Sequence, residues 1–433
     1  MFRKFVKFFI PKSLFKKIEP FGHLLESIVL NIIHGFPARG IKVIGVTGTD
    51  GKTTTTTLIW SMLKESGVKA GYMTTVGYGS HKKQRLNKVH MTTMPIGPML
   101  KRIKELKAEG IEWLVLETTS HALAQNRVWG INYSLAVMTN LGHEHLDYHG
   151  TFEQYRDAKL KLFSKANAYR GGMQAGIVNA DDPSGYIFAS EVQNPLSYGV
   201  EKGDIRATDI KSTSTGSHYI VRRGDESLHI NVNIPGSFNV YNSLAAVCVG
   251  IKLDLTNEQI EKGIDSLKAV EGRMTSIEEG QDFSVIVDFA HTPDSFEKLL
   301  SDMRRQTKTP RRLIVMFGSA GRRDESKRAI QGEIAGRYAD VVVVTEEDDR
   351  DVDGNEIMQQ IASGAEISGK KRDEDLFLVH NRTDAIKFAV GQANKGDVVM
   401  LLGKGHETTI ERAHGEDPWD EVSEARKAIK HKG

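Results

Sequence analysis

Short runs rich in Val, Ile and Leu recur along the chain, and each is followed by a glycine or polar turn and then by a helix-like stretch. In the first half these runs are residues 41–48, 111–120, 133–141 and 174–182. Continuous apolar strands that alternate with helical segments are typical of a parallel sheet covered by helices on both faces. The sequence therefore predicts an α/β fold.

The pattern changes over residues 204–238, where alternating apolar and polar side chains predict an antiparallel patch. A second series of apolar runs then follows, at residues 283–290, 311–318, 339–347 and 396–405. Two such series favour two α/β domains, and a length of 433 residues agrees with two or three domains. We predict a basic and apolar helical segment at 1–40, a central domain at 41–272 and a carboxyl-terminal domain at 273–433.

The composition excludes several classes of protein. The 58 basic and 56 acidic residues nearly cancel, so a nucleic acid is not the expected partner. The single cysteine, Cys248, excludes an internal disulfide and a multi-cysteine zinc site, and it fits a reducing cytosol. We expect a cytoplasmic, monomeric protein.

The amino terminus departs from this balance. Residues 1–18 contain five phenylalanines and six lysines or arginines but no acid. Lys7 interrupts the apolar stretch and no small-residue cleavage site follows, which argues against a signal peptide. Residues 21–36 are too few and too polar to span a bilayer. Two interpretations remain: a helix solvated on its basic side and docked on the other, or peripheral contact of residues 1–20 with anionic lipid at the inner membrane surface.

The run VIGVTGTDGKTTTTTLIW, residues 43–60, joins an apolar strand to a predicted helix through a glycine-rich turn. Backbone amides at the start of that helix would face a phosphate, aided by the positive end of the helix dipole. Lys52 would reach the terminal phosphates of a nucleotide, and Thr53 would bind magnesium. The first glycine of the common P-loop pattern would fall at Val46, so the spacing is a variant. Such a turn also occurs by chance, but its place between strand and helix favours nucleotide binding.

Two further predicted strands end in residues that suit metal chemistry. Glu117 ends the strand in LETTSHALAQNRV, at the edge where α/β sheets bind ligands, so it is a candidate magnesium ligand rather than a solvated loop acid. After the next strand, TNLGHEHLDYHG gathers His143, His145 and His149 beside two acids. From the residues alone, a zinc site and a polar surface loop fit this block equally well.

One lysine interrupts an apolar stripe. Thr151 and Gln154 predict the start of a helix as a capping box. The helix carries an apolar stripe from Phe152 to Ala166, and Lys159 stands where the stripe should continue. A lysine on a buried face either extends its amine to solvent or, when desolvated, has a lowered pKa and a neutral, reactive amine. Both interpretations fit the sequence.

These blocks resemble those of the Mur ligase family, the ATP-dependent ligases that build the peptidoglycan stem peptide. TGTDGKTTT resembles the ATP-binding loop of the family, in which asparagine usually stands at the position of Asp50. The resemblance runs from about Ile41 to Gly405 with its blocks in order. It implies an α/β protein with a central P-loop-type parallel-sheet ATPase domain and a Rossmann-like carboxyl-terminal domain, and with ATP and Mg²⁺ as cofactors.

The resemblance also implies roles for individual residues. Lys159 matches the lysine that is carbamylated in the family and that completes a second metal site together with His145. The implied catalytic residues are Lys52, Glu117, His145 and Lys159. The implied metal ligands are Thr53, Glu117, His145 and Lys159. The implied ATP-binding residues are Gly48, Thr49, Asp50, Gly51, Lys52, Thr53, Thr54, Asn140, Asn242, Arg273, Asp288 and His291.

Other blocks resemble the branch of the family that adds a diamino acid to the muramyl dipeptide. The residues implied to hold the acceptor are Thr92, Thr93, Ser120, Gln125 and Arg127. Those implied to meet the incoming amino acid are Arg323, Asp348, Arg350, Gly403 and Glu407. The Asp-Asn-Pro-Arg box of the diaminopimelate enzymes falls at residues 347–350 and keeps only Arg350, which would pair with a distal carboxylate. The acid at Asp348 would instead meet the ammonium of lysine or ornithine.

The implied reaction joins meso-diaminopimelate or L-lysine to UDP-MurNAc-L-Ala-D-Glu through an acyl phosphate, in peptidoglycan precursor synthesis. We expect the usual amino-terminal uridine-nucleotide domain to be shortened or missing, because only residues 1–40 precede the first strand. Two alternatives remain: a different acceptor, as in folylpolyglutamate synthetases, or a nucleotide-gated scaffold subunit without catalysis. The blocks LDYHG and GKGHE argue against the first alternative, and Lys52, Glu117, His145 and Lys159 argue against the second.

Overall fold

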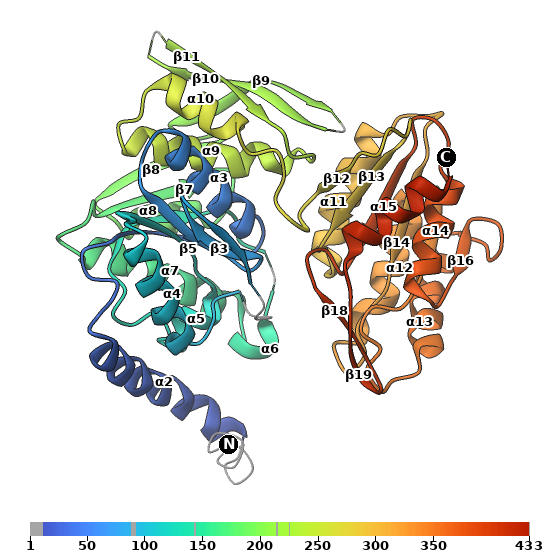
Figure 1. Cartoon of the computed structure of the whole chain (residues 1–433), viewed down its shortest axis with the longest axis horizontal. Helices are drawn as coiled ribbons and strands as arrows, with labels where there is room; N and C mark the ends of the chain where they lie inside the picture. The colour runs from blue at the N-terminus through green and yellow to red at the C-terminus, as the bar shows by residue number, and fades with distance from the viewer. Residues whose placement is uncertain (1–11, 88–91, 143, 214, 225, 433) are drawn as a thin grey trace. The chain divides into compact units, whose positions relative to one another are not determined.

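The structure is a computed structural model, and it describes residues 12–87, 92–142, 144–213, 215–224 and 226–432. The chain forms two compact units (Figure 1). The first consists of Met1–Thr208, Ile220–Ile230 and Tyr241–Ser266, and the second of Asp209–Tyr219, Asn231–Val240 and Leu267–Gly433.

Helices and strands alternate over most of both units. The helices up to residue 266 are α2 (Lys12–His34), α3 (Lys52–Glu65), α4 (Ile96–Ala108), α5 (Ser120–Ala124), α6 (Leu146–His149), α7 (Phe152–Ala168), α8 (Gly185–Ser190), α9 (Phe238–Lys252) and α10 (Asn257–Asp265). The strands there are β1 (Lys42–Thr47), β2 (Ala70–Met73), β3 (Gly77–Ser80), β4 (Gln84–Leu86), β5 (Trp113–Glu117), β6 (Tyr133–Met138), β7 (Ala175–Asn179), β8 (Asn194–Gly199), β9 (Ile205–Thr213), β10 (Gly216–Arg223) and β11 (Glu226–Val232).

The later helices are α11 (Pro293–Gln306), α12 (Ser326–Tyr338), α13 (Gly354–Ile367), α14 (Arg382–Gln392) and α15 (Glu421–Lys432). The later strands are β12 (Thr275–Ile277), β13 (Ser284–Asp288), β14 (Leu313–Phe317), β15 (Val341–Val344), β16 (Leu376–Leu378), β17 (Val398–Leu402), β18 (Thr409–Arg412) and β19 (Gly415–Pro418).

An 11-stranded sheet in the order β11-β10-β9-β8-β7-β6-β1-β5-β2-β3-β4 organises the first series of strands. Its central strands are parallel: β1 pairs with β5 and β6, β5 pairs with β2, and β6 pairs with β7. Residues 43–47 of β1 are all buried, which explains why this run shows no polar alternation. At one edge, β11 alternates exposed and buried residues, as the change of pattern at residues 204–238 predicts.

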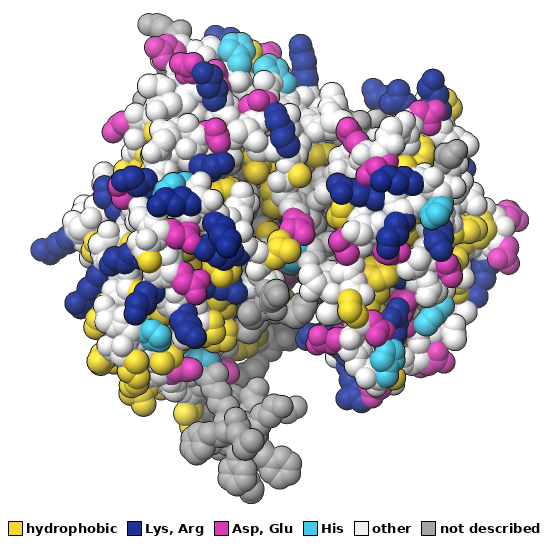
Figure 2. All heavy atoms as spheres, in the orientation of Figure 1, with side chains coloured by type: hydrophobic (Ala, Val, Ile, Leu, Met, Phe, Trp, Pro, Cys, Tyr) yellow, Lys and Arg dark blue, Asp and Glu magenta, His cyan; other side chains and the backbone are white. Residues whose placement is uncertain are grey.

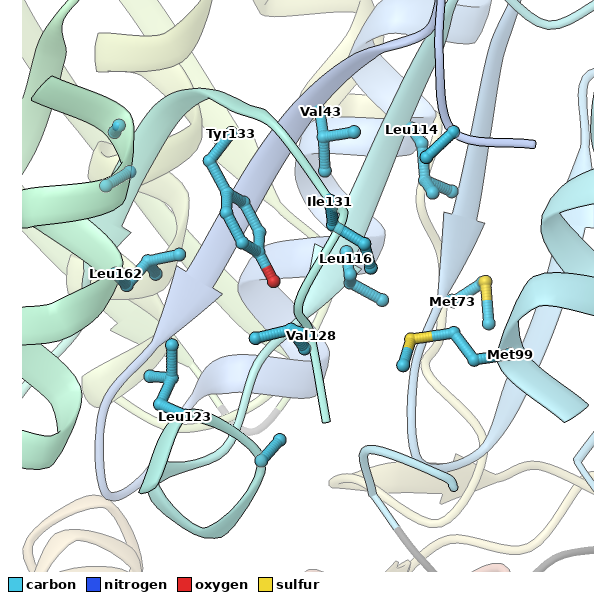
Figure 3. Close-up of a cluster of buried hydrophobic side chains, with 14 of the residues drawn as sticks. Val43, Met73, Met99, Leu114, Leu116, Leu123, Val128, Ile131, Tyr133 and Leu162 are labelled. Carbon is cyan, nitrogen blue, oxygen red and sulfur yellow. The ribbon is translucent and has the colours of Figure 1, made fainter. Parts of the chain in front are cut away.

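Helices α4, α5, α7 and α8 contribute apolar side chains to one core on this sheet (Figure 3). Gly45 in β1 lets α7 approach closely, because a Cβ at this position would lie 2.6 Å from Leu162 and 2.7 Å from the ring of Tyr133. Thr151 caps α7 by accepting a hydrogen bond from the backbone amide of Gln154 at 3.3 Å. These contacts fix α7 beside the turn that follows β1.

The second unit contains a six-stranded sheet in the order β12-β13-β17-β14-β15-β16. β13, β17, β14, β15 and β16 pair in parallel, and β12 adds an antiparallel edge. Helices α14 and α15 pack on it, and the core between them consists of side chains such as Val287, Val343 and Ile386. The predicted α/β fold class, a parallel-sheet domain followed by a second α/β domain, is confirmed.

The amino-terminal helix α2 precedes the first sheet strand. The membrane contact predicted for residues 1–20 falls largely on residues 1–11, which lie outside the described residues. Within the described part of the chain, no helix combines the length and the apolar character needed to cross a bilayer.

Candidate functional site

The glycine-rich turn lies between β1 and α3. Gly48 has a φ of 150°, and a Cβ there would lie 1.8 Å from Thr139 Oγ1. Gly51 has a φ of 78°, and a Cβ there would lie 2.1 Å from Asn242 Oδ1. Both positions therefore require glycine, because the turn presses against the residue that follows β6 and against α9.

The turn presents groups that suit an anion. Gly51 is the N-cap of α3 and has no side chain to accept from the amides of the first helical turn, so these amides are available to a ligand. Lys52 folds over the turn and donates to the carbonyl of Thr49. Asn140, after β6, holds the turn through two hydrogen bonds to the backbone of Asp50. Its Oδ1 accepts from the amide at 2.9 Å, and its Nδ2 donates to the carbonyl at 3.1 Å.

Glu117 ends β5 beside the start of α3, where Thr53 and Thr54 are buried. Its carboxylate is 1% exposed and lies 3.1 and 3.0 Å from the Thr53 hydroxyl. It also accepts from the backbone amide of Thr75 at 2.9 Å and lies 3.2 Å from the Thr75 hydroxyl. Thr75, two residues after the end of β2, could not be singled out from the sequence.

The environment of Glu117 fits a divalent cation. Its hydrogen-bond donors are neutral, and none of the ion pairs of the described residues involves it. Charge near it comes from the buried amine of Lys159, which interacts with Glu117 without forming an ion pair, and a buried carboxylate that lacks a direct ionic partner is costly. Carboxylate and hydroxyl oxygens are also the donors that Mg²⁺ prefers, so Glu117 and Thr53 are suited to hold it.

Lys159 is directed into the same region from α7. It is 2% exposed, and its Nζ donates to the carbonyl of Gly48 at 2.5 Å and lies 4.4 Å from the ring centroid of Tyr155. Its amine therefore does not extend to solvent. Burial, reinforced by the positive charge of Lys52, lowers the pKa of Lys159 well below its usual value.

His145 lies at the exposed end of this group. It is the N-cap of α6 in the left-handed conformation, and its Nε2 lies 3.7 Å from Glu144. Its ring centroid is 4.7 Å from that of His121 and 6.3 Å from that of Tyr155. Tyr155 thus stands between His145 and Lys159, and its hydroxyl lies 3.0 Å from Thr49 Oγ1. In the sequence Tyr155 belongs to the apolar stripe that runs from Phe152 to Ala166, which gives no sign of this polar contact.

The other histidines of the block have different surroundings. His149 is buried, and its Nε2 lies 3.0 Å from Ser120 Oγ. His143 lies outside the described residues. Among the residues that the structure describes, the three-residue group able to hold a metal ion is elsewhere, at Glu346, Asp349 and His380. The zinc interpretation therefore gains no ligand set at this block.

The predicted acceptor residues form a network around the end of β5. Thr93 Oγ1 donates at 3.2 Å to the carbonyl of Glu117. The buried Arg127 donates to the carbonyl of Thr93 and, at 2.8 Å, to Gln125 Oε1. Thr92 precedes Thr93 and is partly exposed. Hydrogen bonds thus link Thr93 to Glu117 and, through Arg127, to Gln125, and Ser120 is three residues after Glu117.

The predicted ATP-binding residues of the second unit gather around Phe289. Asp288 ends β13 and accepts from the amides of Met274 and Ala290, both at 2.8 Å, while burial raises the pKa of Asp288. The guanidinium of Arg273 lies 4.9 Å from the Phe289 ring centroid, and the ring of His291 lies 4.6 Å from it. Burial and the charge of Lys327 lower the pKa of His291.

The predicted amino-acid-binding residues lie at the carboxyl ends of β15 and β17. The 1%-exposed Lys404 pairs with Asp348 at 2.8 Å and with Glu407 at 2.7 Å. Burial alone would lower the pKa of Lys404, but these two carboxylates raise it. Arg350 is held by Glu411 and by the Gly321 carbonyl. Neither Lys404 nor Glu411 stands out in the sequence as a binding residue.

Glu347 lies in the same loop after β15. Unlike Asp348 and Glu407, it forms no ion pair with another described residue. It is buried, and a Cβ at Gly403 would lie 2.8 Å from its Oε2, so Gly403 leaves room beside it. Arg323 is exposed on the loop before α12. This edge of the second sheet therefore carries both cationic and anionic side chains. Among the acids, the buried Glu347 carboxylate makes no ion pair with the described residues and could bind a ligand.

The chain matches the sequence profile of the Mur ligase middle domain over residues 46–250. It matches the profile described as Mur ligase, glutamate ligase domain, over residues 272–405. The two matches cover the turn, Glu117 and Lys159 in the first unit and the predicted amino-acid residues, except Glu407, in the second.

Similar proteins of known name cover nearly the whole chain. UDP-N-acetylmuramyl-tripeptide synthetase of Roseiflexus sp. is 40% identical over 92% of this chain and 81% of its own length. UDP-N-acetylmuramoyl-L-alanyl-D-glutamate–2,6-diaminopimelate ligase of Geobacillus kaustophilus is 37% identical over 94% of this chain and 82% of its own length. A solved structure of a ligase of the latter name is 28% identical and superposes with a TM-score of 0.67, covering 96% of this chain and 83% of that one. On these matches, the chain belongs to the Mur ligase family of ATP-dependent, amide-forming ligases.

Proposed function

We propose that the chain joins a diamino acid to UDP-MurNAc-L-Ala-D-Glu, with ATP as the energy source, in peptidoglycan precursor synthesis. The names of the relatives from Roseiflexus and Geobacillus support this substrate class. The observation that carries the proposal is the meeting of three features in the first unit: the glycine-rich turn with its free helix amides, the buried Glu117 carboxylate, which no ion pair of the described residues involves, and the buried Lys159 amine.

In this proposal the turn binds the ATP phosphates, with Lys52 reaching the terminal ones. Thr53 and Glu117 hold Mg²⁺, which supplies positive charge to the phosphoryl group in transfer. The γ-phosphoryl group passes to the side-chain carboxylate of D-glutamate, so that the bond to ADP breaks and an acyl phosphate forms. The amine of the diamino acid then attacks the acyl carbon, and inorganic phosphate leaves. The chain contributes mainly by positioning the reactants and by neutralising charge.

Lys159 has the properties that carbamylation requires. A neutral lysine amine adds to carbon dioxide, giving a carbamate and releasing one proton, and the lowered pKa makes the neutral form available. The carbamate would place a negative charge near Gly48, and together with His145 it would bind a second Mg²⁺. This assignment turns a buried amine, which is costly to charge, into a metal ligand.

We assign ATP and acceptor binding to a domain at residues 41–272 and amino-acid binding to a domain at 273–433. Thr92, Thr93, Ser120, Gln125 and Arg127 would hold the muramyl peptide. In the second domain, the loops that follow β15 and β17 would hold the diamino acid. The side chains that would contact it are Glu347, Asp348, Arg350 and Glu407. Arg273, Asp288 and His291 would complete ATP binding.

The test measures phosphate release by the full chain with ATP and Mg²⁺ while the acceptor and the amino acid are added separately and together. Release that needs both UDP-MurNAc-L-Ala-D-Glu and a diamino acid, with a product heavier by the added residue, supports the proposal. Release without an amino acid, or none with any of meso-diaminopimelate, L-lysine and L-ornithine, contradicts it. Binding of ATP without turnover under all these conditions would instead favour a scaffold subunit.

A further inference from the structure

The inward side of helix α2 carries the buried polar residues His23, Ser27 and Asn31 beside the partly buried Leu30, and its outward side is apolar. Its outer stripe follows the helical repeat, with spacings of three and four residues, and its members are 45% to 72% exposed. These residues are Ile18, Phe21, Leu25, Val29, Ile32 and Ile33. They are half of the large hydrophobic side chains that are exposed among the described residues. Figure 2 shows hydrophobic side chains gathered on this part of the surface, at the lower left, where Figure 1 places α2.

The inward side of α2 is fixed by specific polar contacts. Ser27 Oγ donates to the carbonyl of Asn126 at 3.1 Å, and Asn31 Nδ2 donates to the carbonyl of Trp129 at 3.0 Å. Asn31 packs so closely on Gly130 that a Cβ there would lie 2.7 Å from its amide group. His23 is also buried and lies 3.3 Å from Glu26. Rotating α2 to bury its apolar stripe would break these hydrogen bonds and leave buried polar groups without partners.

Most of the charged residues near the stripe in the sequence and on α4 are basic, although Glu26 on α2 and Glu105 on α4 are also exposed. The sequence before Ile18, residues 1–17, contains six lysines or arginines and no acid. Helix α4, which packs against α2, exposes Lys101, Lys104 and Lys107. Lys107 donates to the carbonyl of Arg39, which is itself exposed just after α2. An apolar stripe flanked by lysine and arginine matches a surface with an apolar interior and negative headgroups.

We propose that the outer face of α2 is a docking surface for an anionic phospholipid bilayer. The stripe would enter the boundary between headgroups and acyl chains, and the basic residues would contact the phosphates. The helix would lie in the plane of the surface. The enzyme would thereby work at a membrane surface, independently of which acceptor and amino acid it joins.

The test is cosedimentation of the full chain with vesicles of phosphatidylcholine, with and without phosphatidylglycerol. We expect the chain to bind vesicles that contain phosphatidylglycerol, and to bind them more weakly at high salt. Binding to vesicles of phosphatidylcholine alone should be weaker than to those with phosphatidylglycerol. The variant F21Q/L25Q/I32Q keeps helix-forming residues and should bind about a hundredfold more weakly, because three large side chains no longer leave water. The control Y186Q/I330Q/I367Q changes three other exposed side chains and should bind like the natural chain.

A second measurement does not depend on these triple variants. Phe21→Trp places a fluorophore on the stripe, and its emission should shift to shorter wavelength when phosphatidylglycerol vesicles are added. Absence of cosedimentation and of this shift would overturn the proposal, as would an equal loss in the control variant. A natural chain that is a dimer in solution and becomes monomeric in F21Q/L25Q/I32Q, without binding vesicles, would also overturn it, because a second copy would then cover the stripe.

Discussion

The hydroxyl of Thr53 lies within hydrogen-bonding distance of both carboxylate oxygens of Glu117, at 3.1 and 3.0 Å, although α3 and β5 are separate elements. The pairing follows from the parallel register of β1 and β5, in which Val46 lies opposite Glu117. The turn after β1 and the end of β5 therefore emerge at the same edge of the sheet, where α/β proteins bind ligands.

Glu117→Gln should abolish most of the activity while leaving the fold intact. The amide keeps the size of the carboxylate and can bond to Thr53 and Thr75, but it removes the negative charge that would hold Mg²⁺. We expect acceptor-dependent phosphate release to fall by at least about 100-fold, with a higher Mg²⁺ requirement for what remains. The control is Glu112→Gln. Glu112 is an exposed acid just before the same strand, and it forms an ion pair with Lys69. Unchanged Mg²⁺ dependence in Glu117→Gln would contradict the metal assignment.

Carbon dioxide should be required for full activity. Lys159→Met places an apolar side chain of similar length in the buried site, but this side chain cannot form a carbamate. We therefore expect this variant to lose phosphate release. Lys161→Met, an exposed position on the same helix, should retain it. The natural enzyme should lose activity in buffers freed of carbon dioxide and recover it on addition of bicarbonate. Labelled bicarbonate should give a carbamate carbon signal in the natural chain and in Lys161→Met but none in Lys159→Met.

The stability of the first unit should also report on Lys159. Its pKa in the folded state is lowered, so between that pKa and the ordinary value near 10.5 the unfolded chain binds a proton that the folded chain does not. The free energy of unfolding should therefore rise with pH across this window. In Lys159→Met this contribution is absent, so its profile, measured by urea denaturation in carbon-dioxide-free buffer, should be flatter. Parallel profiles for the two proteins would contradict a lowered pKa.

Much of the site could be predicted from the sequence because it depends on strand ends. Continuous apolar runs identify buried parallel strands, and polar residues at the strand ends or within a few residues of them, such as Lys52, Glu117 and Asn140, are brought to one edge by the topology. Lys159 could be singled out because a charge breaks an otherwise apolar helical stripe. For these residues, periodicity carries the spatial information.

The remaining residues could not be predicted because their roles depend on which side chains meet. Thr75 contributes a backbone amide, which any residue would offer, and a hydroxyl whose contact with Glu117 no sequence pattern indicates. Tyr155 fits an apolar stripe, and only its position shows that its hydroxyl reaches Thr49. Arg350 is surrounded in sequence by acids, but its partner is Glu411, 61 residues later. The orientation of α2 was also hidden, since helical periodicity identifies an apolar side without saying whether it faces the protein.

Gly51→Ala and Gly67→Ala form a matched pair at the two ends of α3. Both glycines have nearly the same φ, 78° and 80°. Alanine at either position should therefore cost about 1 kcal/mol in backbone strain. A Cβ at Gly51 would lie 2.1 Å from Asn242, whereas a Cβ at Gly67 would meet nothing within 4 Å. We expect Gly51→Ala to lose ATP binding in calorimetry and Gly67→Ala to keep it at slightly lower stability. Equal ATP affinity in both variants would show that the turn does not hold the nucleotide.

The choice of amino acid should follow the charges at the ends of β15 and β17. Arg350 is already paired with Glu411, so the distal carboxylate of meso-diaminopimelate would have to displace that acid. Glu347 is buried and belongs to no ion pair of the described residues, so it suits the distal ammonium of L-lysine or L-ornithine. We expect a higher kcat/KM for these two than for meso-diaminopimelate. Glu347→Gln should raise the KM for the amino acid by at least about tenfold, the loss of one charge-assisted hydrogen bond, and leave the KM for ATP unchanged. Glu411→Gln should free Arg350 and shift the preference toward meso-diaminopimelate; a preference for meso-diaminopimelate in the natural chain would show that Arg350 leaves Glu411 when the substrate binds.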